Sequence, residues 1–323
     1  MKTGMKSLFH NRLSLPGGMF IIMTSLILVI TACSGGKNKA PIVDDTMTSG
    51  TIHISVDESF RPVIDSQIKV FLSQFPDAHI ITHYKPEADC IKDLLNDSIR
   101  MVIVTRGLSE EEVNFFKDTL EYAPLFGIIA SDAIAVVVNN SAKDSLFSVS
   151  DIRGMLNGSS GFKYKLVMDG NKATSTVRFM VDSVLKGLPF SANVQAAASS
   201  EGVIDYVAKN ADAIGFVGVS WIGNPEDTAQ LSFLHKVKIA NLQCRTCETE
   251  SYVKPYQANI VMKRYPMVRG LYYILKENYA GLGKGFMSFL TNQKGQLIFK
   301  RAYLAPARMS LEVRHVDMEE SNF

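Results

Sequence analysis

The sequence predicts an α/β protein of two lobes, with the second lobe inserted into the first. Short strand-like apolar segments alternate along the chain with segments of helical periodicity. This order is typical of strands and helices packed in layers, with right-handed crossovers between parallel strands. Two long extended segments interrupt the alternation, and each predicts a crossing from one lobe to the other. Residues 51–310 are numerous enough to build two lobes with proper cores.

The first lobe is expected to begin at residues 51–56, where Ile52, Ile54 and Val56 alternate with other residues as in a half-buried strand. Ser109 and Glu112 have the spacing of a capping box, which predicts the start of a helix. Further elements follow the same patterns: strands at 79–84 and 101–105, and helices at 60–75 and 88–97.

The extended residues 132–138 are expected to lead into the second lobe, and residues 256–262 to lead back out of it. The second lobe would contain strands at 165–168 and 213–217, and helices at 150–156, 176–185 and 201–210. Three helices would close the chain, at 267–278, 283–291 and 294–302. We therefore assign residues 51–134 and 258–310 to lobe 1, residues 135–257 to lobe 2, and residues 311–323 to a C-terminal tail.

The N-terminus has the composition of an export signal. Three basic residues precede an apolar run at residues 19–30, which is shorter than the roughly 20 apolar residues of a membrane span. The following Ile-Thr-Ala-Cys resembles a bacterial lipobox, in which Cys33 is lipidated. We expect a lipoprotein signal peptide at residues 1–32 and a flexible tether through residue 50, so that the protein is lipid-anchored and faces the periplasm or cell exterior. An uncleaved membrane anchor is the alternative.

The charge of the mature chain excludes one class of partner. Residues 1–32 contain three basic residues and no acidic residue, so their removal changes the formal net charge from +2 to −1. A chain without a basic excess is not expected to bind nucleic acid. We expect a monomer whose contact with the membrane is made through the lipid.

Cysteines and histidines predict no metal site. Cys244 and Cys247 have C-x-x-C spacing but lack a second Cys/His pair nearby, and the motif does not open a helix after a strand. In an oxidising compartment a local disulfide is the better interpretation, and Cys90 is expected to be a small buried residue. No cofactor is expected, and the usual hydrolase and nucleotide-binding motifs are missing, so we do not expect an enzyme.

The stretch DGNKATSTVRF, residues 169–179, is unusually rich in hydrogen-bond donors. It lies between a predicted strand and a predicted helix, where free backbone amides and the helix dipole favour an anion. The hydroxyls of Thr174, Ser175 and Thr176 would add donors without adding mobile charge. One of them could instead be a simple helix cap, and Arg178 could pair with Asp182 instead of clamping an anion.

Several stretches together resemble the PstS-type phosphate-binding proteins, including a lipoprotein subgroup of that family. They occur in order at residues 105–112, 132–139, 169–179, 213–218, 263–277 and 281–306. The resemblance implies a periplasmic-binding-protein type II fold whose lobes close on an oxyanion, with two hinge crossings. It also implies a function, the binding of inorganic phosphate or a similar oxyanion for delivery to an ABC-type importer. An adaptor or sensor lipoprotein that kept the fold without tight phosphate binding is the alternative.

The resemblance and the strand ends together select the candidate site residues. The hydroxyls of Thr174, Ser175 and Thr176 stand at the family's Ser-Gly-Thr, and Arg178 follows them. The other candidates follow two lobe 1 strands, at the carboxyl ends where ligands of open α/β sheets bind: Asp57, Glu58, Ser59, Thr105 and Arg106. Ser59 could also be a plain cap, whereas Arg106 could form a bidentate contact with phosphate.

The sequence departs from the family pattern at two positions. Typical members have an aspartate after the third strand, where it accepts the proton of hydrogen phosphate and so excludes sulfate; this chain has Thr105 and Arg106 there. The arginine expected four residues before the Ser-Gly-Thr is replaced by Gly170. Asp57 or Asp169 could take the role of proton acceptor.

Overall fold

The computed structural model describes residues 45–170, 174–224 and 227–308 of the 323-residue chain. The predicted signal peptide, Cys33, most of the tether and the predicted tail lie outside these ranges. Within the described ranges, none of the helices has both the length and the apolar character that a membrane crossing requires.

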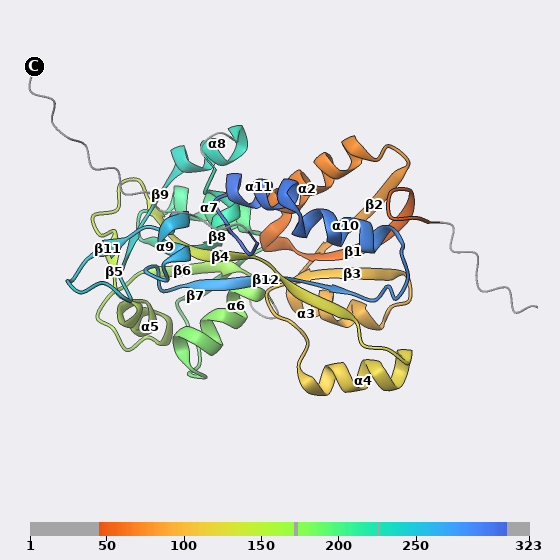
Figure 1. The fold of residues 1–323 in the computed structure, drawn as a ribbon. Coiled ribbons are helices and arrows are strands. Elements are labelled where there is room, and N and C mark those ends of the chain that lie inside the picture. Colours follow the sequence, from red (N-terminus) through yellow and green to blue (C-terminus); the bar gives the residue numbers. More distant parts are fainter. Residues whose placement is uncertain (1–44, 171–173, 225–226, 309–323) are drawn as a thin grey trace, which may run out of the picture. The chain divides into compact units, whose positions relative to one another are not determined.

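Lobe 1 is a sheet covered by helices on both faces (Figure 1). Its parallel strands β1 (Gly50–Asp57), β2 (Ala78–Lys85) and β3 (Ile99–Val104) stand in the order β2-β1-β3. Three helices follow the strands: α2 (Arg61–Gln74), α3 (Glu87–Lys92) and α4 (Glu110–Leu120). The predicted capping box is confirmed, because Ser109 accepts from the Glu112 amide and the Glu112 side chain accepts in return.

One long strand belongs to both lobes. Strand β4 (Leu125–Asn139) pairs with β12 (Val268–Leu275) over its first part and with β8 (Ala213–Gly218) over its second. The change of partner falls between Ala133 and Ile134. The predicted extended segment at 132–138 is therefore confirmed as a crossing between lobes.

Lobe 2 repeats the arrangement of a parallel sheet with connecting helices. Strands β6 (Lys165–Asp169) and β7 (Val194–Ala197) extend the sheet in the order β4-β8-β6-β7. The helices are α5 (Val149–Asn157), α6 (Ser175–Phe179) with its π-helical continuation at Met180–Leu185, α7 (Ser200–Lys209) and α8 (Thr228–Lys236). Strand β9 (Val237–Ile239) also pairs with β4, and β5 (Leu146–Phe147), β10 (Asn241–Gln243) and β11 (Tyr252–Val253) form a small second sheet.

The second crossing differs from its sequence-based prediction. The segment expected to be extended contains the short helix α9 (Gln257–Val261), and the segment expected to be a helix is strand β12. Strand β12 lies between β3 and β4 and is antiparallel to both. The prediction of a helix was wrong because the apolar residues Leu271, Ile274 and Leu275 also fit helical spacing, whereas pairing with β3 and β4 makes the segment extended. Helices α10 (Leu282–Thr291) and α11 (Gln293–Arg301) and the short strand β13 (Ala305–Pro306) complete lobe 1.

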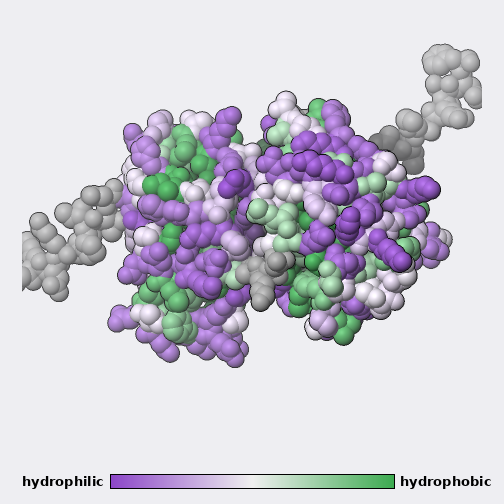
Figure 2. Space-filling model, turned by 180° about the vertical axis from the view of Figure 1, so that it is seen from behind, coloured by the Kyte–Doolittle hydropathy of each residue, from purple (hydrophilic) through white to green (hydrophobic). Residues whose placement is uncertain are grey.

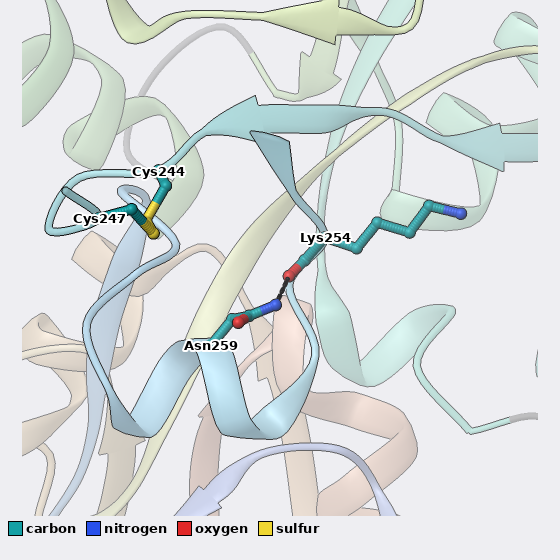
Figure 3. Close-up of a disulfide and its surroundings, with 4 residues drawn as sticks. All are labelled: Cys244, Cys247, Lys254 and Asn259. Carbon is teal, nitrogen blue, oxygen red and sulfur yellow. Dashed lines mark hydrogen bonds between the residues drawn. A yellow bond between two sulfur atoms is a disulfide. The ribbon is translucent and has the colours of Figure 1, made fainter. Parts of the chain in front are cut away.

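A disulfide closes the loop between β10 and β11 (Figure 3). Cys244 and Cys247 are joined with a Cα–Cα distance of 5.7 Å. Just beyond β11, the Asn259 side chain donates to the Lys254 carbonyl oxygen at 2.9 Å and thereby fixes the entry into α9. Cys90 is buried and unpaired, as expected.

The surface seen from behind the view of Figure 1 is largely hydrophilic, and its apolar side chains appear as separate patches (Figure 2). Inside, the largest apolar cluster includes residues of both lobes, among them Ile54 and Phe71 of lobe 1 and Leu166 and Phe216 of lobe 2, and each lobe has a smaller cluster of its own. The lobes are therefore packed around shared apolar contacts as well as linked by the crossing strands.

Candidate functional site

An ion pair lies where the two crossing strands pass each other. Arg269 on β12 stands directly opposite Asp132 on β4, and its Nε donates to the Asp132 carboxylate at 2.8 Å. Both side chains are almost fully buried, with exposed fractions of 3% and 0%. Burial alone would lower the pKa of Arg269, but the neighbouring carboxyls, Asp132 foremost, raise it. Arg269 therefore supplies a fixed positive charge at the base of the junction between the lobes.

Lobe 2 contributes hydroxyls at the start of α6. Thr174 is the N-cap, and its side chain accepts from the Val177 amide, so the cap that the sequence offered as one alternative is present. Ser175 and Thr176 are completely buried, and their hydroxyls accept from Arg269 Nη1 at 2.9 and 3.4 Å. The donor-rich stretch is therefore brought to the buried guanidinium.

Lobe 1 contributes Asp57 and Ser59 at the end of β1. Asp57 caps the short turn Glu58–Phe60 by accepting from the Ser59 amide at 3.0 Å. The Ser59 hydroxyl crosses to lobe 2, where it lies 3.2 Å from an Asp169 carboxylate oxygen and 3.4 Å from the Ser175 hydroxyl. The structure thus brings together residues that are more than a hundred positions apart in the sequence.

Two carboxyls of this cluster titrate near neutral pH. Burial raises the pKa of Asp57 to about 6, although Arg269 opposes the shift. Burial, together with the negative charges of Asp57 and Glu58, raises the pKa of Asp169 to about 7. Oδ2 of Asp57 and Oδ1 of Asp169 are buried and have no hydrogen-bond partner among the described residues. These two groups can therefore exchange a proton with a bound solute.

Arg178 links the lobes instead of facing the cluster. From α6 it donates through Nε to Glu87 of α3 at 2.6 Å and through Nη2 to the Thr105 hydroxyl at 2.6 Å. Burial opposes ionisation of Glu87, but hydrogen bonds from Arg178 and Thr105 lower its pKa. The contact with Asp182 that the sequence suggested is also present, at 3.6 Å. We call Arg178, Glu87 and Thr105 the interlobe latch.

Two further sequence candidates are engaged away from the hydroxyl cluster. Arg106 donates to both carboxylate oxygens of Glu112, at 2.7 and 2.8 Å, and is thereby tied to the capping box of α4. In this structure its donors point to Glu112, and the expected contact of Arg106 with an anion stays a prediction. Glu58 accepts from Ser200 of lobe 2 at 2.9 Å and forms a second contact between the lobes.

A cavity of about 300 Å³ opens beside the cluster. Its lining combines lobe 1 residues at or just after the ends of β1 and β2 with lobe 2 residues at or just after the ends of β6 and β7. These residues are Asp57, Glu58, Arg61, Tyr84, Lys85, Pro86, Asp169, Gly170, Thr174, Ala198 and Ser199. Two larger cavities of about 520 and 530 Å³ are lined mainly by lobe 2 residues and do not include the buried charges. We take the smaller one as the functional cavity, because buried ionisable groups, not volume, mark a functional site.

Sequence reasoning missed the residues that hold the cluster together, namely Arg269, Asp132 and Glu87. Arg269 lies in a stretch predicted to be helical, where an arginine is ordinarily solvated. A strand assignment would have placed it beside the long extended segment that contains Asp132. The available signal was a pair of opposite charges, one in the first predicted crossing segment and one shortly after the second.

Two α/β lobes joined by crossing strands, with buried donors and protonatable acceptors between them, define a bilobal solute-binding protein. The chain belongs to the PBP superfamily, because the model of the PBP superfamily domain matches residues 44–294. No curated protein matches the chain significantly.

Solved structures share this fold at low sequence identity. A putative phosphate ABC transporter substrate-binding protein with bound phosphate from Clostridium perfringens is 20% identical, with a TM-score of 0.67 over 80% of this chain and 100% of that one. An ABC-type phosphate transport receptor from Vibrio cholerae is 16% identical, with a TM-score of 0.58 over 79% of this chain and 99% of the receptor. PstS from Borrelia burgdorferi is 15% identical, with a TM-score of 0.51 over 80% and 99%. These likenesses establish the two-lobed fold.

Proposed function

We propose that the protein binds inorganic phosphate or a similar oxyanion in the cleft between its lobes and delivers it to an ABC-type importer. The observation that carries the proposal is the buried cluster at the lobe junction. Arg269, Ser59, Ser175 and Thr176 supply charge and donors there, as an oxyanion removed from water requires. The Clostridium perfringens structure of the same fold contains phosphate, which supports the same choice of ligand here.

Two buried carboxyls favour a protonated oxyanion over sulfate. Asp57 and Asp169 each have an unpartnered oxygen, and either can accept the proton of hydrogen phosphate. Sulfate has no such proton at neutral pH and would face the Asp57 carboxylate, which is mostly ionised at pH 7 because its pKa is about 6. Either carboxyl thereby supplies the acceptor that typical family members have after the third strand.

Calorimetry on the mature chain at pH 7 with phosphate and sulfate tests this proposal. We expect phosphate to bind at least 100-fold more tightly, equivalent to about 2.7 kcal/mol. Equal affinities for the two anions would refute the role of the carboxyls, and no binding of either anion would refute the proposed function.

An excess of carboxyl groups around the cluster favours the second candidate, an adaptor or sensor that does not bind phosphate tightly. Asp57, Asp132 and Asp169 surround a single buried guanidinium, and Glu58 lies beside them. Binding of phosphate only at millimolar concentration, with no gain at lower pH, would support this alternative.

The membrane anchor is proposed from the N-terminal sequence. Lipidation of Cys33 after removal of residues 1–32 would hold the protein at the membrane, facing the periplasm or cell exterior, where it could meet a permease. Incorporation of labelled palmitate into the wild-type protein, and its loss in Cys33→Ala, is the expected result. Equal labelling of the two chains would exclude Cys33 as the attachment site.

A further inference from the structure

Arg269 occupies a position that no single lobe provides. It lies near the start of β12, beside the point where β4 passes between the lobes, and its guanidinium carbon stands 4.9 Å from the centre of the Phe60 ring of lobe 1. On the other side it reaches the hydroxyls of Ser175 and Thr176 in lobe 2. Asp132, on β4, holds the Nε end of the group. One side chain therefore contacts both lobes and the strand that crosses between them.

The contact with Ser175 has a directional consequence. A serine hydroxyl has one hydrogen to donate, and its lone pairs accept. Because the Ser175 oxygen accepts from Arg269 Nη1 at 2.9 Å, its hydrogen is turned away from the guanidinium. The Ser175 hydroxyl also bonds the Asp57 carboxylate and lies 3.4 Å from the Ser59 hydroxyl, both in lobe 1. Arg269 thus orients a lobe 2 hydroxyl toward polar groups of lobe 1.

The guanidinium also retains donor capacity. Nη2 of Arg269 is buried and has no hydrogen-bond partner among the described residues. An unpaired buried donor on a charged group is unfavourable by more than an ordinary lost hydrogen bond. A Cβ atom added to Gly218 would lie only 3.1 Å from this nitrogen, so the glycine keeps the space beside it open. An acceptor that reached this nitrogen would relieve the cost, although Arg269 is not among the residues that line the cavity of about 300 Å³.

We propose that Arg269 supplies the positive charge of the anion site, through its own donors and through the Ser175 and Thr176 hydroxyls that it orients. The inference rests on the proposed function and adds the residue that replaces the missing upstream arginine. Because the charge stands opposite Asp132, next to the crossing of β4 between the lobes, the anion would be bound where the lobes are joined. Binding and lobe closure then depend on the same side chain.

The test compares substitutions of Arg269 with a matched control, Arg100→Gln. Arg100 on the neighbouring strand β3 also pairs with buried carboxylates, including Glu277 at 3.2 Å, but it lies outside the cluster. With inorganic phosphate as the titrant, Arg269→Gln is expected to weaken binding about 100-fold and Arg269→Lys about 10-fold. The control is expected to remain within about threefold of the wild type. A folded Arg269→Gln protein that binds phosphate as the wild type does would overturn the proposal.

The single substitution leaves Asp132 as an unpaired buried charge, which can prevent folding. The double variant Arg269→Gln/Asp132→Asn removes both charges, and we expect it to fold and still to bind phosphate about 100-fold more weakly. If the double variant binds normally, the proposal is wrong.

Two outcomes separate this inference from the function on which it rests. A wild-type protein that binds neither phosphate nor sulfate overturns both, whereas normal binding by the variants overturns only the role of Arg269. Should neither variant fold, a crystal structure of the wild-type protein with phosphate decides. An anion within hydrogen-bond distance of Arg269 or of the two hydroxyls supports the proposal, and an anion bound elsewhere overturns it.

Discussion

Replacement of Arg178 by glutamine is expected to open the cleft. Arg178 joins Glu87 and Thr105 across the lobes, and Glu87 has an exposed side-chain fraction of only 3%. Breaking a buried ion pair from one side costs about 3–5 kcal/mol because the remaining charge is left uncompensated. Arg178 itself is 39% exposed, so solvent screening reduces this figure, and we take about 2 kcal/mol.

If the latch exists only when the lobes are closed, its loss destabilises the closed form by about 2 kcal/mol. The ratio of closed to open molecules then falls roughly 30-fold. When the closed form becomes a minor species, the apparent phosphate affinity falls with its fraction. Calorimetry measures the affinity, and small-angle scattering of the unliganded protein measures the opening. Asp182→Asn is the matched control. Asp182 contacts Arg178 from within the same helical segment, so this substitution breaks no contact between the lobes and should change neither the affinity nor the scattering.

Glu87→Gln distinguishes a latch from direct binding of the anion by Arg178. The latch reasoning predicts that Glu87→Gln opens the protein and weakens binding much as Arg178→Gln does. If Arg178 bound the anion directly, releasing it from Glu87 would leave affinity unchanged or improve it. Wild-type affinity and wild-type scattering in Glu87→Gln would refute the latch.

Three other outcomes are expected. Burial raises the folded-state pKa of Asp169 to about 7. The stability that this carboxyl contributes is therefore complete below pH 4 and is lost as the pH rises to about 7, a change of about 4 kcal/mol. Urea unfolding at a series of pH values should show this decline, and Asp169→Asn should lack it. Gly215→Ala should lower stability by about 1–3 kcal/mol in thermal unfolding, because its Cβ would lie 2.7 Å from a Val203 methyl group, and an unchanged melting temperature would contradict the packing. Reduction of the Cys244–Cys247 disulfide, which closes a very short loop, should lower stability by about 2 kcal/mol. Phosphate binding should be retained because neither cysteine lines the candidate cavity, and its loss on reduction would contradict this reasoning.

The sequence predicted elements whose signals are local. The capping box of Ser109 and Glu112 depends on a spacing of three residues, and the alternation in β1 depends on neighbours along one strand. Strand β12 has no such local signal. Its apolar residues Leu271, Ile274 and Leu275 fit helical spacing equally well, and only the flanking strands β3 and β4 make this segment extended.

The residues at the strand ends of the candidate site were predictable, but the partners of its charged side chains were not. Ser59 and Ser175 follow strands at the carboxyl edge of their sheets, a position that the strand order alone indicates. Which carboxylate an arginine meets depends on the path of distant segments. Arg106 meets Glu112, and Arg269 meets Asp132 on a strand 137 residues away in sequence.

The position of β12 has a consequence for folding. It is the last long strand to be synthesised, yet it stands in the middle of the lobe 1 sheet, between β3 and β4. Until it is in place, β3 and the first part of β4 each expose an unpaired edge, which invites association with other chains. Lobe 2 has its own main strands within one continuous segment and can form earlier. Chains that end before residue 268 should therefore aggregate through lobe 1, and contacts across the whole domain make its assembly the slow step of folding.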